Sequence, residues 1–293
     1  MKLAKIVKQC RIDKPDKFKL ADFDPAETFG LSTDIEEVRA ILADGVARLE
    51  HMQERLFAHG RWAVLIVLQA MDAAGKDGVI KHVMSGINPL GCLVHAFKAP
   101  SAEELAHSFL WRIDKYLPER GRIGIFNRSH YEEVLAVRVH PELLERQNLP
   151  PQASRKNFWK HRFQDIRCFE RHLTRNGTLV LKFHLRISKK EQRKRFLARL
   201  TDTSKRWKFS ASDIAERAYW HDYMAAYEEM IDETSTDYAP WFVIPADHKH
   251  VAWVIVSAAI VEAIAALKPE YPEIAGKALK DLKKAERALR DEG

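Results

Sequence analysis

A stretch of nine residues without a charge, WAVLIVLQA at positions 62–70, constrains the fold of this chain more than any other feature. A strand that is apolar along its whole length is typically buried on both faces, as a central strand of a parallel sheet is. A turn containing Gly75 and Lys76 follows it, and then a helical segment. This order predicts an α/β domain, in which ligands bind at the carboxyl edge of the sheet.

Other apolar segments repeat this arrangement along the chain. Four more have the length expected of buried strands, and they span residues 92–99, 123–126, 178–187 and 241–246. Helical patterns lie between them, for example over 158–173 and 212–231. The alternation predicts a parallel five-stranded sheet flanked by helices.

Capping-box sequences, a Ser or Thr followed three residues later by Glu, mark helix starts. The first, at Thr33, precedes a long amphipathic pattern that ends at Gly60. The second, at Ser101, predicts a helix to about Leu117. The third, at Ser188, opens a strongly basic helix.

We expect the chain to have three parts. Residues 1–60 form an N-terminal arm and the long helix, and residues 1–30 are expected to be extended because they lack periodicity. Residues 61–270 form the main domain. Residues 271–293 form a charged amphipathic helix at the periphery.

The cellular setting is constrained by cysteine content and hydropathy. The three cysteines form no C-x-x-C pair and their number is odd, so neither a disulfide framework nor a zinc site is indicated, which fits a reducing, cytoplasmic compartment. No apolar run approaches the roughly 20 residues that span a bilayer. The most apolar helical segment, 251–267, contains Ser257 and Glu262, so a buried helix explains it better and no membrane partner is expected.

The segment Gln69–Gly78, QAMDAAGKDG, has the position of a phosphate-binding loop. A loop between a buried strand and a helix directs backbone N–H groups at one point, which favours phosphate. The common pattern G-x-x-x-x-G-K-[ST], the Walker A motif, is only partly matched, because Ala70 replaces the first glycine and Asp77 the hydroxyl residue. We expect phosphate contacts from Ala73, Ala74, Gly75, Lys76, Asp77, Gly78 and Lys81.

Two acids in an anion site predict a bound cation. Asp72 and Asp77 would repel phosphate unless a cation lay between them, and Mg²⁺ is held by few carboxylates plus phosphate oxygens. The alternative is an ordinary turn with a helix-capping acid. We therefore predict Mg²⁺ as cofactor, with Asp72 and Asp77 as ligands and with Asp72 and Lys76 in catalysis.

The sequence FNRSHYEE places a second set of polar residues at the end of the predicted strand 123–126. Asn127 stands where phosphate-loop enzymes usually have a magnesium-linked aspartate, and Arg128 could pair with phosphate. Both are catalytic candidates, although helix capping is an alternative for this turn. We place Glu132, Glu133 and Arg138 on the acceptor side.

The segment 189–208 carries nine Lys or Arg against two acids, in a chain of net charge +7. We interpret it as a lid over a polyanionic substrate, at about 189–210, because it lies where a kinase lid would close. Aromatic residues among the cations leave single-stranded nucleic acid as a less favoured partner. The predicted lid cations are Arg193, Arg195, Arg199, Lys205, Arg206 and Lys208.

Five segments, in this order and spacing, resemble polyphosphate kinase family 2 from about residue 17 to 270. They are LQAMDAAGKDG, INPLG, IGIFNRSHYEEVL, RWKFSASD and TSTDYAPWFVIPAD. The form FNRSHYE looks most like the subgroup called class III. Asn127 departs from the family pattern, in which many members have Asp at this position.

The resemblance implies a thymidylate kinase-like, P-loop kinase-like fold with a helical lid. It implies Mg²⁺, inorganic polyphosphate as donor, and AMP or ADP, with GMP or GDP as further candidates, as acceptors in a reversible transfer. The alternatives are an ATP-dependent nucleoside monophosphate kinase and a non-catalytic polyanion binder. The acids of the loop argue against the binder. We also expect a homo-oligomer.

Overall fold

The computed structural model describes the chain apart from residues 1, 14, 16, 152, 154–155 and 293 and the side chain of Lys208. Six strands form one sheet in the order β1-β6-β5-β2-β4-β3. Their bounds are β1 Arg11–Ile12, β2 Ala63–Gln69, β3 Cys92–Ala96, β4 Ile123–Asn127, β5 Thr178–Arg186 and β6 Trp241–Pro245.

The sheet is mixed, so the prediction of five parallel strands is wrong by one strand. β2 to β6 are parallel, and β1 is added at the edge, antiparallel to β6. β1 has only two residues, so it leaves no apolar run in the sequence.

The prediction that residues 1–30 are extended is also wrong. Helix α1 (Lys2–Cys10) precedes β1 and buries Ile6, Val7 and Cys10 in the main core. The start of the chain is therefore part of the main core, where α1 packs on α12.

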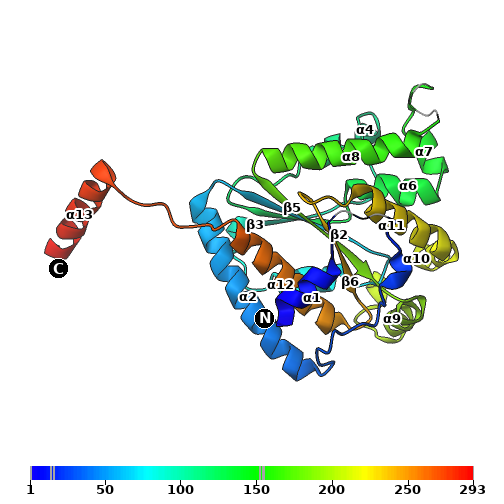
Figure 1. The fold of residues 1–293 in the computed structure, drawn as a ribbon, viewed down its shortest axis with the longest axis horizontal. Helices are drawn as coiled ribbons and strands as arrows, with labels where there is room; N and C mark the ends of the chain where they lie inside the picture. The colour runs from blue at the N-terminus through cyan, green and yellow to red at the C-terminus, as the bar shows by residue number, and fades with distance from the viewer. Residues whose placement is uncertain (1, 14, 16, 152, 154–155, 293) are drawn as a thin grey trace.

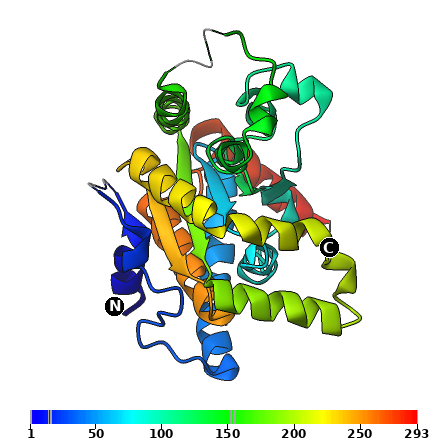
Figure 2. The ribbon, with the colours of Figure 1, turned by 90° about the vertical axis from the view of Figure 1, so that its right-hand side faces the viewer.

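Helices cover both faces of the sheet (Figures 1 and 2). On one face α12 (Lys249–Ala266) packs against α1, α2 (Ile35–His59) and α3 (Lys76–Val83). The other face carries α8 (Phe158–Arg175), which packs on β5, and α11 (Trp220–Thr234), which packs on α8. Both faces of the central strands are thus covered, and all seven residues of β2 are buried.

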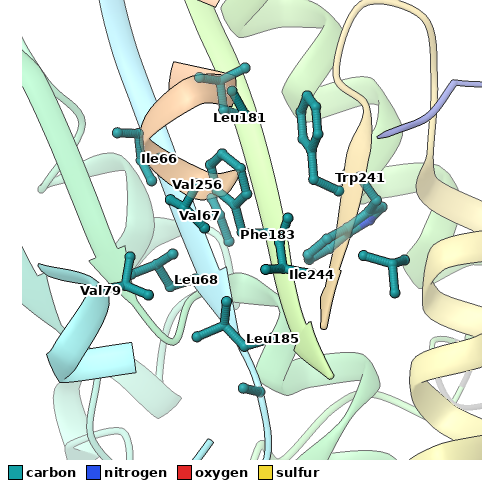
Figure 3. Packing of buried hydrophobic residues seen from close by; sticks show 14 of the residues in the cluster. Ile66, Val67, Leu68, Val79, Leu181, Phe183, Leu185, Trp241, Ile244 and Val256 are labelled. Atoms are coloured by element: carbon teal, nitrogen blue, oxygen red, sulfur yellow. The ribbon is translucent and has the colours of Figure 1, made fainter. Parts of the chain in front are cut away.

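Side chains of β5 alternate between the two helical layers, as strand geometry requires. Phe183 and Leu185 lie in the apolar layer that includes Val256 of α12 (Figure 3). Lys182, between Leu181 and Phe183, points the other way and contacts Glu170 of α8. The charged residue in this apolar strand is therefore buried among the helices α8 and α11.

α12 is the one helix in the described part of the chain that is long and apolar enough to cross a membrane by length and composition. Its most apolar window is 61% buried inside the protein. It packs on α2, α3 and β6, as the predicted buried helix at 251–267 should.

The three predicted helix starts differ in outcome. α2 begins one residue later than predicted, because Asp34 and not Thr33 accepts the cap hydrogen bond, from Glu36 N. The capping box at Ser101 is present, but α4 (Ala102–Leu105) is a single turn and does not run to Leu117. Ser188 caps α9 (Lys189–Thr201) as predicted.

Short helices and 3₁₀ turns complete the connecting loops. They are α5 Trp111–Asp114, α6 Ala136–Val139, α7 Glu142–Glu145, α10 Ala211–Glu216 and the 3₁₀ turns Leu20–Asp22, Pro89–Gly91, His130–Val134, Arg206–Lys208 and Arg217–Tyr219. The predicted C-terminal helix is α13 (Gly276–Asp291). It projects from the body on an extended linker, and its described residues are exposed (Figure 1).

Candidate active site

The loop from β2 to α3 wraps around the side chain of Lys76. Lys76 Nζ donates to Ala70 O at 2.7 Å, and Met71 O lies 3.5 Å away. Gly75 has a φ of 117°, which a residue with a Cβ rarely adopts, and Ala73 is left-handed at 61°. Burial lowers the pKa of Lys76. The predicted phosphate loop is therefore a tight turn closed around its own lysine.

The second motif lies beside this loop because β4 pairs with β2 in parallel register, with Asn127 opposite Leu68. Asn127 Nδ2 donates to Asp77 Oδ1 at 2.9 Å, and Arg128 Nη2 is 2.7 Å from Asp72 Oδ1. Asp72, Lys76, Asp77, Asn127 and Arg128, predicted separately on two segments, thus meet at one edge of the sheet.

Arg128 adopts a left-handed backbone conformation, with a φ of 63°. Such strain in a residue other than glycine persists only where the surroundings determine it, and it gathers at functional sites. The guanidinium lies between Asp72 and Glu132, whose Oε2 is 3.5 Å from Nη1. The charge of Glu132, and then that of Asp72, raises the pKa of Arg128. Arg128 therefore keeps its charge at every physiological pH.

Besides Glu132, the carboxylates of Asp72, Asp77 and Asp213 of α10 lie in or near the loop. Burial raises the pKa of Asp213, and the negative charge of Asp72 raises it further, so the two carboxylates are close enough to repel each other. Among the described residues no group of three or more metal-type side chains is arranged to hold an ion alone. Mg²⁺ needs few protein carboxylates when phosphate oxygens complete its shell. The residues present fit such an ion beside bound phosphate.

Arg195, predicted to contact phosphate from the lid, has other partners in the structure. It is buried on α9, and its Nη1 donates to Ala73 O at 3.1 Å and to Ala74 O at 2.7 Å. Nη2 donates to Ala246 O at 2.5 Å and to Asp247 O at 3.0 Å. Arg195 therefore joins the phosphate loop to the end of β6, and it faces backbone carbonyls.

The other predicted lid residues are more exposed than Arg195. Arg199 Nη1 lies 3.4 Å from Asp213 Oδ2, so this pair joins α9 to α10 at the edge of the site. Arg193 is exposed on α9, Lys205 pairs with Asp202, and Arg206 donates to Leu200 O. The side chain of Lys208 lies outside the described residues. Contact of these cations with a substrate stays a prediction.

A cavity of about 520 Å³ opens beside Arg128. Apolar residues such as Phe97, Phe109 and Leu143 line it. Glu132 and Glu133, placed on the acceptor side from the sequence, also line it. The cavity has the size and mixed lining of a small-molecule site, and it shares Arg128 with the phosphate loop.

Two predicted residues have structural partners beside this cavity. Burial raises the pKa of Glu133, whose Oε1 lies 2.8 Å from Arg162 Nε. Arg138 pairs with Glu229 of α11 and is not among the cavity's lining residues.

Two predicted phosphate contacts lie on α3. Lys81 is exposed on α3, more than one helical turn beyond Lys76. A Cβ at Gly78 would lie 3.4 Å from Trp253, so this glycine lets α3 approach α12.

Several residues of the site were missed in the sequence. Gln192 of α9 donates to Asp72 O at 2.9 Å, and the charge of Asp72 raises the pKa of Asp213. Asp213 belongs to the segment RWKFSASD, whose acid was a usable signal. No pattern in the sequence marked Phe97 and Phe109 as walls of a cavity, because short turns and loops build that wall.

Comparison with known proteins gives a consistent result. The family model described as polyphosphate kinase 2 matches residues 32–272. An ADP-polyphosphate phosphotransferase of Rhodopseudomonas palustris is 52% identical, over 91% of this chain and 92% of its own. An AMP/ADP-polyphosphate phosphotransferase of Meiothermus ruber is 45% identical, over 91% and 96%.

A solved structure agrees with these sequence matches. The crystal structure of polyphosphate kinase 2 from Arthrobacter aurescens superposes with a TM-score of 0.87 at 41% identity, and covers 100% of this chain and 98% of that one. The family model and this structure are both named polyphosphate kinase 2, and the two relatives are both named polyphosphate phosphotransferases. The chain belongs to the polyphosphate kinase 2 family.

Proposed function

We propose that this protein transfers the terminal phosphoryl group of inorganic polyphosphate to a nucleoside monophosphate or diphosphate. One observation carries the proposal: Arg128 belongs at once to the phosphate loop, through Asp72, and to the lining of the 520 Å³ cavity. A group at that point can contact a phosphoryl group shared by donor and acceptor. The relatives named for ADP and AMP transfer support the same substrates.

In the proposed reaction an oxygen of the acceptor's terminal phosphate attacks the end phosphorus of polyphosphate. One P–O bond forms and one breaks, and the shortened polyphosphate leaves with the bridging oxygen. Lys76 and Arg128 stabilise the charge on the transferring group, as cations do in phosphoryl transfer. The phosphate loop is the part of the site that corresponds to a P-loop kinase.

Mg²⁺ is proposed as the cofactor, held by Asp72 and Asp77 together with phosphate oxygens. When bound it neutralises charge on those oxygens. Asn127 supports Asp77 through its 2.9 Å hydrogen bond, which offers a role for an amide where many members have Asp. Contact between Asn127 and the metal is not needed in this arrangement.

The cavity is proposed to hold the nucleoside of the acceptor. Its aromatic side chains can stack on a base, and Arg112, whose guanidinium lies 5.2 Å from the centre of the Phe97 ring, forms part of the same wall. Guanine nucleotides are proposed as further acceptors. Because the phosphoanhydride bonds of polyphosphate and of the nucleotide are similar in energy, we propose that transfer is reversible.

An ATP-dependent nucleoside monophosphate kinase would use the same loop, so the test must separate the donors. The purified protein is given ADP or AMP with polyphosphate and Mg²⁺, and in a parallel sample AMP with ATP and no polyphosphate. The proposal expects that phosphorylated nucleotide forms only in the sample with polyphosphate, or that it forms there at least tenfold faster than with ATP. Equal or faster transfer from ATP would refute it. A homo-oligomer and a cytoplasmic location also stay proposals, for light scattering and cell fractionation to test.

A further inference from the structure

An ion pair without solvent exposure lies behind the second motif. Lys182 Nζ of β5 is 2.6 Å from Glu170 Oε2 of α8, and both side chains are 0% exposed. Burying two charges removes them from water at a cost, and apolar residues of similar volume often serve stability as well. A role beyond packing therefore has to be sought in what the pair holds.

The ammonium of Lys182 uses all three of its donors. Besides Glu170, Nζ donates to Tyr131 Oη at 3.0 Å and to Thr234 O at 2.8 Å. The Tyr131 hydroxyl donates in turn to Glu170 Oε1 at 2.7 Å. One buried junction thus joins the strand β5, helix α8, the 3₁₀ turn after Arg128 and the end of α11.

Two of these elements form the walls around Arg128. Tyr131 lies three residues after the left-handed Arg128, in the 3₁₀ turn that follows it. α11, fixed at Thr234, carries Tyr223 and Tyr227, which lie with Arg128 around a small hollow beside the loop. The junction therefore fixes both the backbone that carries Arg128 and the helix that faces it.

Other polar contacts of the turn do not involve the Lys182 junction, and the backbone N–H of Arg128 donates to Leu68 O of β2 at 3.1 Å. Ser129 Oγ accepts from Tyr131 N and contacts Gln69 Nε2 of β2 at 3.0 Å, and Glu133 Oε1 of the same turn lies 2.8 Å from Arg162 Nε of α8. The buried ring of His130 makes no hydrogen bond with any described residue, and its Nε2 lies 3.6 Å from Glu170 Oε1. The Tyr131 hydroxyl is thus the polar tie between the turn and the junction.

We infer that Lys182, Glu170 and Tyr131 are positioning residues for phosphoryl transfer, because they hold Arg128 in the geometry that contacts the transferring group. The inference rests on the proposed role of Arg128. All three side chains are fully buried and none of them lines the cavity, so they act through Arg128.

The test is Tyr131→Phe, which removes one hydroxyl and keeps the ring, packed at 4.8 Å on Trp241. A displacement of about 1 Å of a reacting group can cost on the order of 10²-fold in rate. We expect kcat for ADP and polyphosphate to fall by about tenfold to 10²-fold, with both KM values within threefold. The double variant Lys182→Met with Glu170→Met should show the same loss of kcat while the melting temperature stays within a few degrees.

A double-mutant cycle shows whether the effect passes through Arg128. In an Arg128→Ala background, Tyr131→Phe should cause no further loss of kcat. Ile264→Val is the control for stability, because Ile264 is fully buried at the far end of α12 and its methyl group has no link to the turn. Its melting temperature should fall while kcat stays unchanged.

Three results would separate the possible failures. If Tyr131→Phe keeps full kcat, the junction is structural only and the inference is wrong. If the losses in Tyr131→Phe and Arg128→Ala multiply independently, the junction does not act through Arg128, and the inference is also wrong. If Arg128→Ala itself turns over normally, the proposed role of Arg128 fails, and the inference fails with it.

Discussion

Arg195 gives the sharpest prediction about the phosphate loop. Arg195→Met keeps most of the buried stem and removes the guanidinium from Glu191 and from four backbone carbonyls, two of them at Ala73 and Ala74. A hydrogen bond to a charged group contributes about 1.5–3 kcal/mol. The two bonds on the loop side therefore stabilise its conformation by about 3–6 kcal/mol, as an upper limit because water can replace part of this.

A loop that loses this support no longer holds Lys76 in place. We expect kcat to fall by about 10²-fold, the size of effect that a shift of about 1 Å produces. We expect KM for polyphosphate to change little, since Arg195 faces carbonyls in the structure. The assay measures ATP formed from ADP and polyphosphate, and urea unfolding of the same variant should show a lower free energy of unfolding.

Lys194→Met is the matched control. Lys194 immediately precedes Arg195 on α9. Glu191 lies 2.9 Å from Arg195 Nε and 3.7 Å from Lys194 Nζ, but the Lys194 side chain is 80% exposed. The same loss of charge there should leave kcat and stability nearly unchanged. If Arg195→Met instead keeps its kcat and raises KM for polyphosphate several-fold, Arg195 binds substrate as a lid residue, and the positioning argument is refuted.

Three further predictions concern the chemistry and the stability. Lys76→Ala should lower kcat by on the order of 10²-fold or more, and Asp72→Asn comparably, with unchanged circular dichroism; near-normal turnover in either would remove the loop from the mechanism. EDTA should abolish transfer and added Mg²⁺ restore it, whereas full activity without metal would contradict the proposed site. Burial lowers the pKa of His184 to about 3 from 6.5, so below about pH 6.5 the unfolded chain binds a proton that the folded chain does not. Stability should then fall by about 1.4 kcal/mol per pH unit as the pH drops toward 3, and urea unfolding of His184→Phe at pH 7.5 and 5.0 should show a weaker pH dependence than the parent.

The sequence was most informative where local order determines geometry. A buried strand, a glycine turn and a helix in succession place Lys76 at the sheet edge in any α/β fold, so the loop could be predicted. Asn127 and Arg128 could be placed beside it for the same reason, because both strands end at one edge. β1 could not be predicted, since two residues carry no periodicity and its pairing depends on β6.

Interactions between distant segments were beyond local patterns. The basic character of α9 suggested that Arg195 contacts phosphate, but its burial depends on where the end of β6 lies, at Ala246 and Asp247. Lys182 within the apolar strand TLVLKFHLR was a visible anomaly. Its partner Glu170, on α8, could not be identified from spacing, because the contact depends on how α8 packs against β5.

A phosphorus balance tests the central claim most directly. The protein is incubated with ADP, Mg²⁺ and polyphosphate of one defined length, with no ATP at the start, and all products are separated and counted. We predict that each ATP formed is matched by the loss of one phosphate unit from the polyphosphate end, with no matching release of inorganic phosphate. Formation of ATP and AMP in equal amounts from ADP, with the polyphosphate length unchanged, would contradict the account.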